Sequence, residues 1–182
     1  MSRINAHHSP RSESVEWLSP PEWIERLGPF DLDPCCPARM PWRTARRMVT
    51  RREDGLACQW KGRVWCNPPY GRPPVIEPWM QRMAEHGNGI ALSFARTETH
   101  MWFEYVWPVA TAILFVKGRP TFYRRSVRRA VGNSGGSVVL VAYGARNARV
   151  LERASIDGYL LRPDKFGASR VLRPAIAKAS GA

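Results

Sequence analysis

The sequence predicts an α/β fold in which helices cover both faces of a mostly parallel sheet. Two observations support this fold class. Short apolar runs typical of buried strands alternate along the chain with helical segments. The 182 residues, 44% of them hydrophobic, are enough for a single domain with one core. We expect a disordered leader at 1–14, the domain at 15–160 and a loosely ordered tail at 161–182.

The first predicted elements are a short helix and a short strand. Proline in the first turn and a Gly-Pro pair at the end favour a helix at 19–27. Alternating residues predict a strand at 30–33 that stops at Pro34. We expect residues 34–52 to be irregular and basic, with a short helical piece at 44–48.

The rest of the chain continues the alternation of helices and strands. Residues 54–56 mark a turn, and the apolar run at 63–66 predicts a strand. The later elements are, in order, a helix at 77–86 closed by glycine, a buried strand at 90–94, a polar loop at 95–99, a helix at 100–107, a strand at 112–116, a long basic loop at 117–136, a last clear strand at 137–143 and a helix at 145–155.

Polar side chains follow several of the predicted strands. Asp33 and Pro34 end the first strand, Asp54 follows the basic segment, and the tetrapeptide 67–70 follows the strand at 63–66. Ligands of parallel α/β sheets bind at the carboxyl ends of the strands. We therefore expect these residues to converge on one crevice.

The tetrapeptide Asn67-Pro68-Pro69-Tyr70 is suited to holding a planar group that bears an amino substituent. Its two prolines fix two φ angles, and the residue before them is pushed into an extended conformation. The side-chain oxygen of Asn67 and the carbonyl of Pro68 can each accept a hydrogen bond from an –NH2 group. The ring of Tyr70 can stack on the attached heterocycle. The alternative is an ordinary turn, because asparagine and proline are frequent turn residues.

The net charge of +13 indicates a polyanionic partner. The chain has 28 Lys and Arg against 15 Asp and Glu. Two arginine-rich clusters contain no acidic residue, and arginine suits phosphates and guanine edges. We favour nucleic-acid binding over a solvated surface. The clusters consist of Arg39, Arg43, Arg46, Arg47, Arg51 and Arg52, and of Lys117, Arg119, Arg124, Arg125, Arg128 and Arg129.

Other features argue against a metal site and a membrane location. The four cysteines include no CxxC pair, and the four histidines show no metal-ligand spacing. No stretch reaches the length of a membrane-spanning helix, and residues 1–11 lack the apolar segment of a secretory signal. We expect no metal, reduced thiols and a cytoplasmic location.

A set of motifs now identifies a resemblance. They are Ser19-Pro20-Pro21-Glu22-Trp23, Phe30-Asp31-Leu32-Asp33-Pro34-Cys35, Asp54-Gly55-Leu56 with Trp60, Val64-Trp65-Cys66-Asn67-Pro68-Pro69-Tyr70-Gly71, Ala95-Arg96-Thr97-Glu98-Thr99 with Trp102-Phe103, and Phe115-Val116-Lys117-Gly118-Arg119-Pro120-Thr121-Phe122. In order and spacing the chain resembles, from about Trp17 to Tyr143, the phage-type DNA N-6-adenine methyltransferase (Dam-like) family. The resemblance implies a phage or prophage enzyme acting in a bacterial host cell.

The resemblance implies a Rossmann-like fold that uses S-adenosylmethionine as methyl donor. Asp33, with Pro34 beside it, is then the strand-end carboxylate near the cofactor, although the segment has no glycine-rich loop. Asp54 would accept from the adenine amino group of the cofactor, Leu56 would pack on that ring, and Ser19 would touch its methionine end. The alternatives are an Asx turn at Asp33, a plain turn at Asp54 and a helix cap at Ser19.

The resemblance also implies direct methyl transfer to adenine flipped out of DNA. Asn67, Pro68, Pro69 and Tyr70 would form the catalytic loop, and insertions near 39–52 and 117–136 would recognise the target. The expected DNA contacts are Arg46, Arg47, Arg96, Arg119, Arg124 and Arg125. An RNA adenine methyltransferase or a catalytically weak DNA-binding relative remains an alternative. The sequence predicts neither the target sequence nor the oligomeric state.

Overall fold

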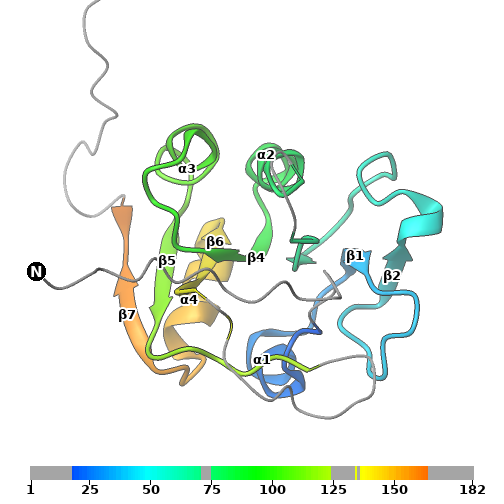
Figure 1. Cartoon of the computed structure of the whole chain (residues 1–182), viewed down its shortest axis with the longest axis horizontal. Helices are drawn as coiled ribbons and strands as arrows, with labels where there is room; N and C mark the ends of the chain where they lie inside the picture. The colour runs from blue at the N-terminus through cyan, green and yellow to red at the C-terminus, as the bar shows by residue number, and fades with distance from the viewer. Residues whose placement is uncertain (1–17, 71–74, 124–133, 135, 164–182) are drawn as a thin grey trace, which may run out of the picture.

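The computed structural model describes residues 18–70, 75–123, 134 and 136–163 (Figure 1). The predicted leader at 1–14 lies outside these residues, and so does the tail beyond residue 163. The described elements are, in chain order, α1 (Pro21–Leu27), β1 (Leu32–Cys36), β2 (Arg47–Thr50), the 3-10 turn η1 (Arg51–Glu53), β3 (Val64–Cys66), α2 (Glu77–His86), β4 (Gly89–Phe94), α3 (His100–Tyr105), β5 (Ala112–Val116), β6 (Val138–Tyr143), α4 (Ala145–Arg153) and β7 (Gly158–Leu161).

Seven strands form one mixed sheet in the order β2-β1-β3-β4-β6-β5-β7. The pairings β1 with β2, β1 with β3 and β3 with β4 are parallel. Strand β6 is antiparallel to both β4 and β5, so β5 runs in the same direction as β1 to β4. Strand β7 is antiparallel to β5. The sheet is therefore more mixed than the sequence predicts, but the carboxyl ends of β1 to β5 still share one edge.

Helices cover both faces of the sheet, as predicted (Figure 1). On one face α1 and α4 pack against alternate residues of the strands, among them Trp65, Leu92 and Leu140. On the other face α2 and α3 pack against the residues between these, such as Cys66 and Ala91. Successive side chains of a strand point to opposite faces of the sheet, which explains the alternation. Because helices cover both faces, both sets of side chains are buried.

Strand β1 continues through Pro34, so the expectation that it stops there is wrong. The register of β1 against β2 shifts between Asp33 and Cys36. Proline cannot donate to a ladder of hydrogen bonds and is tolerated in sheets at such irregularities. The irregularity lets the strand continue to Cys36 although Pro34 has no N–H to donate to the ladder.

Two strands differ from the sequence prediction. The helical piece expected at 44–48 is wrong, because residues 47–50 form β2, whose first residue aligns with Leu32. The fully buried Val49 packs in the core there. Strand β7 was not predicted, because its residues are exposed or half-buried and Tyr159 is 71% exposed.

A buried arginine at the start of β3 joins that strand to α1 and α4. The side chain of Arg63, 2% exposed, donates from Nη1 to the carbonyl oxygens of Leu27 (2.6 Å) and Pro29 (3.0 Å). Its Nε donates to the Oδ1 of Asn147 on α4. Desolvation lowers the pKa of Arg63 to about 10, so it stays charged at neutral pH. These bonds fix α1, and with it the segment that precedes α1, relative to β3.

Candidate active site

The loop after β3 is held by a buried serine that lies 48 positions earlier in the sequence. Ser19 lies immediately before the turn that begins α1 and is 3% exposed. Its Oγ accepts hydrogen bonds from Trp65 Nε1 (2.9 Å) and from Asn67 Nδ2 (3.2 Å). Pro20 is the N-cap residue of α1, and no side chain caps the helix, so a capping role for Ser19 is wrong. The serine instead faces the side chain of Asn67.

Tyr70, the last residue of the loop, packs against the neighbouring strand β4. Its hydroxyl donates to the carbonyl oxygen of Leu92 (3.0 Å), and its ring meets the ring of Phe94 at a centroid distance of 4.8 Å and an angle of 61°. Burial raises the pKa of Tyr70 well above its usual 10, so the phenol is neutral at physiological pH. Pro68 is buried between these anchors, whereas Asn67 and Tyr70 are half-buried.

The end of β1 lies directly beside the end of β3. The thiols of Cys35 and Cys66 are 3.6 Å apart on these neighbouring strands. Burial and the neighbouring thiol raise the pKa of Cys35, while the backbone N–H of Asn67 lowers it. This contact brings the segment that carries Asp33 and Pro34 alongside Asn67, as the strand-end argument predicts.

Asp33 is an almost fully buried carboxyl group, 3% exposed. Its Oδ2 accepts from the hydroxyl of Thr44 and its Oδ1 from the backbone N–H of Cys35 (3.1 Å). Desolvation raises the pKa of Asp33 to about 6, and these two hydrogen bonds partly oppose the shift. Sequence reasoning missed Thr44, which it placed in a helical piece. The bond to Cys35 is the Asx turn that was left as an alternative.

The predicted turn at 54–56 is present and lies on the end of β1. Asp54, exposed and in a left-handed conformation, accepts through Oδ1 from the backbone N–H groups of Leu56 (3.1 Å) and Ala57 (3.3 Å). A β-carbon on Gly55 would lie 1.6 Å from the carbonyl oxygen of Pro34. The backbone of the turn therefore packs directly on Pro34, and the four predicted cofactor residues other than Ser19 form one group.

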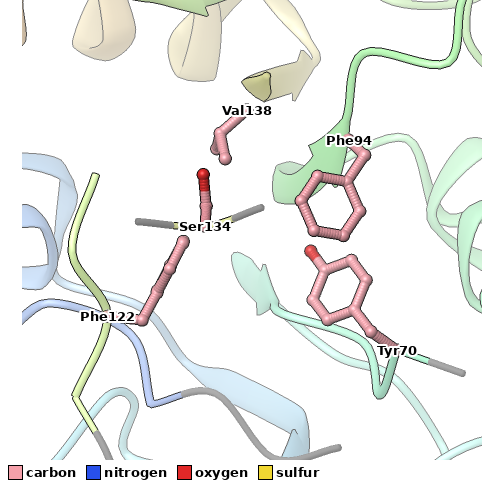
Figure 2. Close-up of a pocket in the computed structure, with 5 residues that line it drawn as sticks. All are labelled: Tyr70, Phe94, Phe122, Ser134 and Val138. Atoms are coloured by element: carbon pink, nitrogen blue, oxygen red, sulfur yellow. The ribbon is translucent and has the colours of Figure 1, made fainter. Parts of the chain in front are cut away.

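A pocket opens beside the loop at the same edge of the sheet. The empty space within it is about 230 Å³, a volume that includes open solvent at its mouth. Figure 2 shows the rings of Tyr70 and Phe94 on one side of this space and Phe122, Ser134 and Val138 on the other. Sequence reasoning missed the last four residues as site residues. The register that pairs Phe94 with Val138 shows how the start of β6 reaches this edge.

The two segments predicted to recognise the target are in contact. Trp42 and Tyr123 meet edge to face at a centroid distance of 5.2 Å. The backbone N–H of Leu18 donates to the carbonyl oxygen of Tyr123 (3.1 Å), which places the residue before Ser19 against the second segment. Within the described part of the chain, these contacts join 39–52, 117–123 and the start of the domain.

The arginines predicted to contact DNA lie at two opposite ends of the parallel strands. Arg96 and Arg119 are exposed and follow β4 and β5, at the edge where β3 ends in Asn67. Arg47 aligns with Leu32 at the opposite edge, about 10 Å from the level of the loop. Arg46, next to it, lies 3.8 Å from the carboxylate of Asp31. Two further predicted contacts, Arg124 and Arg125, lie outside the described residues.

Two exposed arginines follow β2, at the end of the parallel strands where the loop also lies. Arg51 and Arg52 form η1 directly after the last residue of β2. Both belong to the first arginine-rich cluster, but they are not among the predicted DNA contacts.

In the described ranges, no three His, Cys, Asp or Glu side chains are grouped so as to hold a metal ion. No helix described here is long and apolar enough to cross a membrane.

Comparison with known proteins gives one family match and one curated relative. Residues 8–167 match the sequence model of a family described as DNA N-6-adenine-methyltransferase (Dam). The chain is 25% identical over 162 residues to the DNA N-6-adenine-methyltransferase of Escherichia phage T1, an alignment that covers 76% of this chain and 67% of the phage protein. No solved structure matches the chain.

Proposed function

The chain belongs to the DNA N-6-adenine-methyltransferase (Dam) family, and we propose that it transfers a methyl group from S-adenosylmethionine to the N6 amino group of adenine in DNA. One observation carries the proposal beyond the family. The loop of Asn67 and Tyr70 adjoins the group of Asp33, Pro34 and the 54–56 turn at a single edge of the sheet. In the proposed reaction these two groups would form the donor site and the acceptor site, side by side as direct transfer requires.

The residues beside Pro34 fit S-adenosylmethionine. This cofactor carries positively charged groups, hydroxyl groups and a flat ring, and it supplies an electrophilic methyl group. The carboxyl of Asp33 is ionised above pH 6 and can attract a cation, which would lower its raised pKa. Asp54 is exposed, and Leu56, two residues later, is half-buried. A carboxylate and an apolar side chain are therefore available for the polar edge and the face of a ring. Five strands of common direction support a Rossmann-like arrangement of this site.

Asn67 and Pro68 would activate the amino group of the substrate. The lone pair of an adenine amino group is delocalised into the ring, which makes it a weak nucleophile. Hydrogen bonds from its two N–H groups to the Asn67 side-chain oxygen and the Pro68 carbonyl would favour a tetrahedral nitrogen with an exposed lone pair, and the methylated nitrogen would then lose one proton to solvent. The same two oxygens stabilise the positive charge that develops on this nitrogen during transfer. No residue of the chain needs to form a covalent intermediate.

Tyr70 and its neighbours would receive the target base. Base flipping costs a few kcal/mol of lost stacking and pairing, which aromatic contacts in the pocket partly offset. The hydrogen bond to Leu92 and the ring contact with Phe94 fix the ring of Tyr70, so it is an ordered stacking surface. Phe122 and Ser134 lie across the pocket and would bound the base on its other side.

The charge distribution supports DNA as the substrate. Exposed Arg96 and Arg119 follow β4 and β5, the strands on either side of β6, and the chain carries a net charge of +13. Arginine side chains placed in this way bind phosphates near a flipped base. Segments 39–52 and 117–136, which touch through Trp42 and Tyr123, are the proposed target-recognition segments.

The proposal is tested by the choice of acceptor. The protein is incubated with S-adenosylmethionine labelled in the methyl group and with separate pools of DNA, tRNA and protein. We expect label in the DNA pool, in adenine. Label in tRNA or protein but not in DNA would contradict the proposal, and tRNA labelling would point to the RNA alternative.

A further inference from the structure

The bond between Ser19 and Asn67 has a chemical direction. An indole N–H only donates, so the Ser19 oxygen accepts from Trp65 Nε1, and in the structure the same oxygen also accepts from Asn67 Nδ2. The nitrogen of the Asn67 amide is thus on the side of Ser19. The oxygen of the same planar amide consequently lies on the other side of the group.

We propose that Ser19 is a positioning residue that fixes the side-chain amide of Asn67 with its oxygen as the acceptor for the substrate amino group. This inference rests on the proposed function. An amide turned over would present its NH2 group to the substrate NH2, and two donors cannot form a hydrogen bond. The hydrogen bond that Asn67 makes to Ser19 holds the amide in the useful one of two orientations that have nearly the same shape.

The surroundings of Ser19 make it rigid enough for this role. Leu18, 0% exposed, is tied through its backbone to Tyr123, and Ser19 itself is 3% exposed. Trp65 is also 0% exposed and packs on Phe30 at a centroid distance of 5.5 Å. Ser19 and the indole that bonds to it are therefore both fixed in the core, so the bond from Asn67 to Ser19 is formed before substrate binds.

The same geometry separates this role from a contact with the cofactor. Ser19 spends its acceptor capacity on Trp65 and Asn67, and these two bonds are made without any ligand. Loss of the hydroxyl should then lower the rate of methyl transfer while leaving cofactor affinity unchanged. A direct cofactor contact predicts the reverse pattern.

The test compares the full-length protein with Ser19→Ala, Ser19→Thr and Ser93→Ala. Ser93 is the matched control, since it is 1% exposed, lies near the same edge and donates to the carbonyl oxygen of Phe94 (3.2 Å). We measure kcat and KM for DNA, the Kd for S-adenosylmethionine and the thermal midpoint. Ser19→Ala should lower kcat by about 10- to 100-fold, as expected for loss of one orienting hydrogen bond, with the cofactor Kd within about twofold of wild type.

Rescue and volume controls complete the test. Ser19→Thr keeps the hydroxyl and should restore most of kcat, while Ser93→Ala should stay near wild type. If Ser19→Ala does not fold, Ser19→Cys keeps a similar volume with a weak acceptor and should show the same fall in kcat.

The outcomes distinguish the inference from the function on which it rests. A wild-type protein that methylates no adenine in DNA overturns the proposed function, and the inference with it. An active wild type whose Ser19→Ala variant keeps its kcat, or loses cofactor affinity instead, overturns the inference alone. Failure of Ser19→Thr to restore kcat also overturns it.

Discussion

Gly55 and Pro34 are in backbone contact, and a β-carbon on Gly55 would lie 1.6 Å from the Pro34 carbonyl oxygen. On its other side, the carbonyl oxygen of Gly55 accepts from Trp60 Nε1 (2.8 Å). Because glycine has no β-carbon, the turn of Asp54 can pack directly against the strand that carries Asp33. This contact joins the two parts of the proposed cofactor site.

Gly55→Ala should therefore disrupt the cofactor site. The added methyl group must push the turn away from Pro34, at a cost of about 1–3 kcal/mol in the free energy of unfolding. The Kd for S-adenosylmethionine should rise at least tenfold, as measured by calorimetry. Gly87→Ala is the control, because that site has a left-handed φ of 67° but no atom within 4 Å of the added carbon. It should cost about 1–2 kcal/mol and leave the Kd unchanged. If Gly55→Ala bound S-adenosylmethionine with the wild-type Kd, the turn of Asp54 would not be part of the cofactor site.

Asp33→Asn should change how stability depends on pH. The folded-state pKa of Asp33 is raised from 3.8 to about 6, so between these values the folded protein binds a proton that the unfolded chain has released. Stability therefore falls as pH rises from 4 to 7, by about 3 kcal/mol for this shift. Cys35, with its raised pKa, stays neutral in this range.

Relative to Asp33→Asn, wild type should lose unfolding free energy over that pH interval, as chemical denaturation at several pH values would show. The asparagine variant should also bind S-adenosylmethionine more weakly at pH 7.5. A constant stability difference between pH 4 and 7 would mean that the carboxyl is not desolvated as its burial indicates.

Substitutions of Tyr70 should separate stacking from hydrogen bonding. Tyr70→Phe keeps the ring against Phe94 and removes only the bond to Leu92, so the rate of methyl transfer should fall less than tenfold. Tyr70→Ala removes the stacking surface, worth about 1–3 kcal/mol per base, and the rate should fall further, by about 10- to 100-fold. Single-turnover rates on duplex DNA measure both. Equal losses in the two variants would argue that the hydroxyl, not the ring, is what matters.

The salt dependence of DNA binding should identify the arginines that face DNA. Arg96→Gln and Arg119→Gln should each weaken binding and reduce the slope of log K against log salt by about 1. Arg46→Gln should change the slope less, because Arg46 lies beside Asp31 at the opposite edge. Arg149, exposed on α4, provides a control for the loss of one charge. A larger effect at Arg46 than at Arg119 would place DNA on the other edge.

Local signals in the sequence account for the elements that were predicted. The bounds of α2, Glu77–His86, follow from proline in its first turn and from Gly87, whose left-handed conformation ends the helix. Strands β3, β4 and β5 are short apolar runs, and such runs are typical of strands buried on both faces.

The elements that were missed depend on partners distant in the sequence. Strand β2 exists because Arg47–Thr50 pairs with β1, and this pairing outweighs the local preference assumed for 44–48. Pro34 stays within β1 because the register shifts there, which no local pattern indicates. Strand β7 has no buried apolar run of its own and is held by its pairing with β5.

The candidate site was predictable to the extent that it lies at strand ends. The sequence placed Asp33 and Asn67 at one edge, and the contact between Cys35 and Cys66 shows that these strand ends adjoin. The bond between Ser19 and Asn67 spans 48 positions, and the Thr44 bond to Asp33 depends on the path of an irregular loop. Packing of the whole domain determines such contacts, so no motif could have predicted them.

The central claim is that Asn67 promotes methyl transfer to adenine N6, and one measurement tests it most directly. Duplex DNA is incubated with S-adenosylmethionine and either wild type or Asn67→Ala, then digested, and N6-methyladenine is quantified by mass spectrometry. We predict N6-methyladenine with wild type and a loss of at least about 100-fold in its rate of formation with Asn67→Ala, while the cofactor Kd stays near wild type. Equal methylation by both proteins, or a variant that has lost cofactor binding instead, would contradict the account.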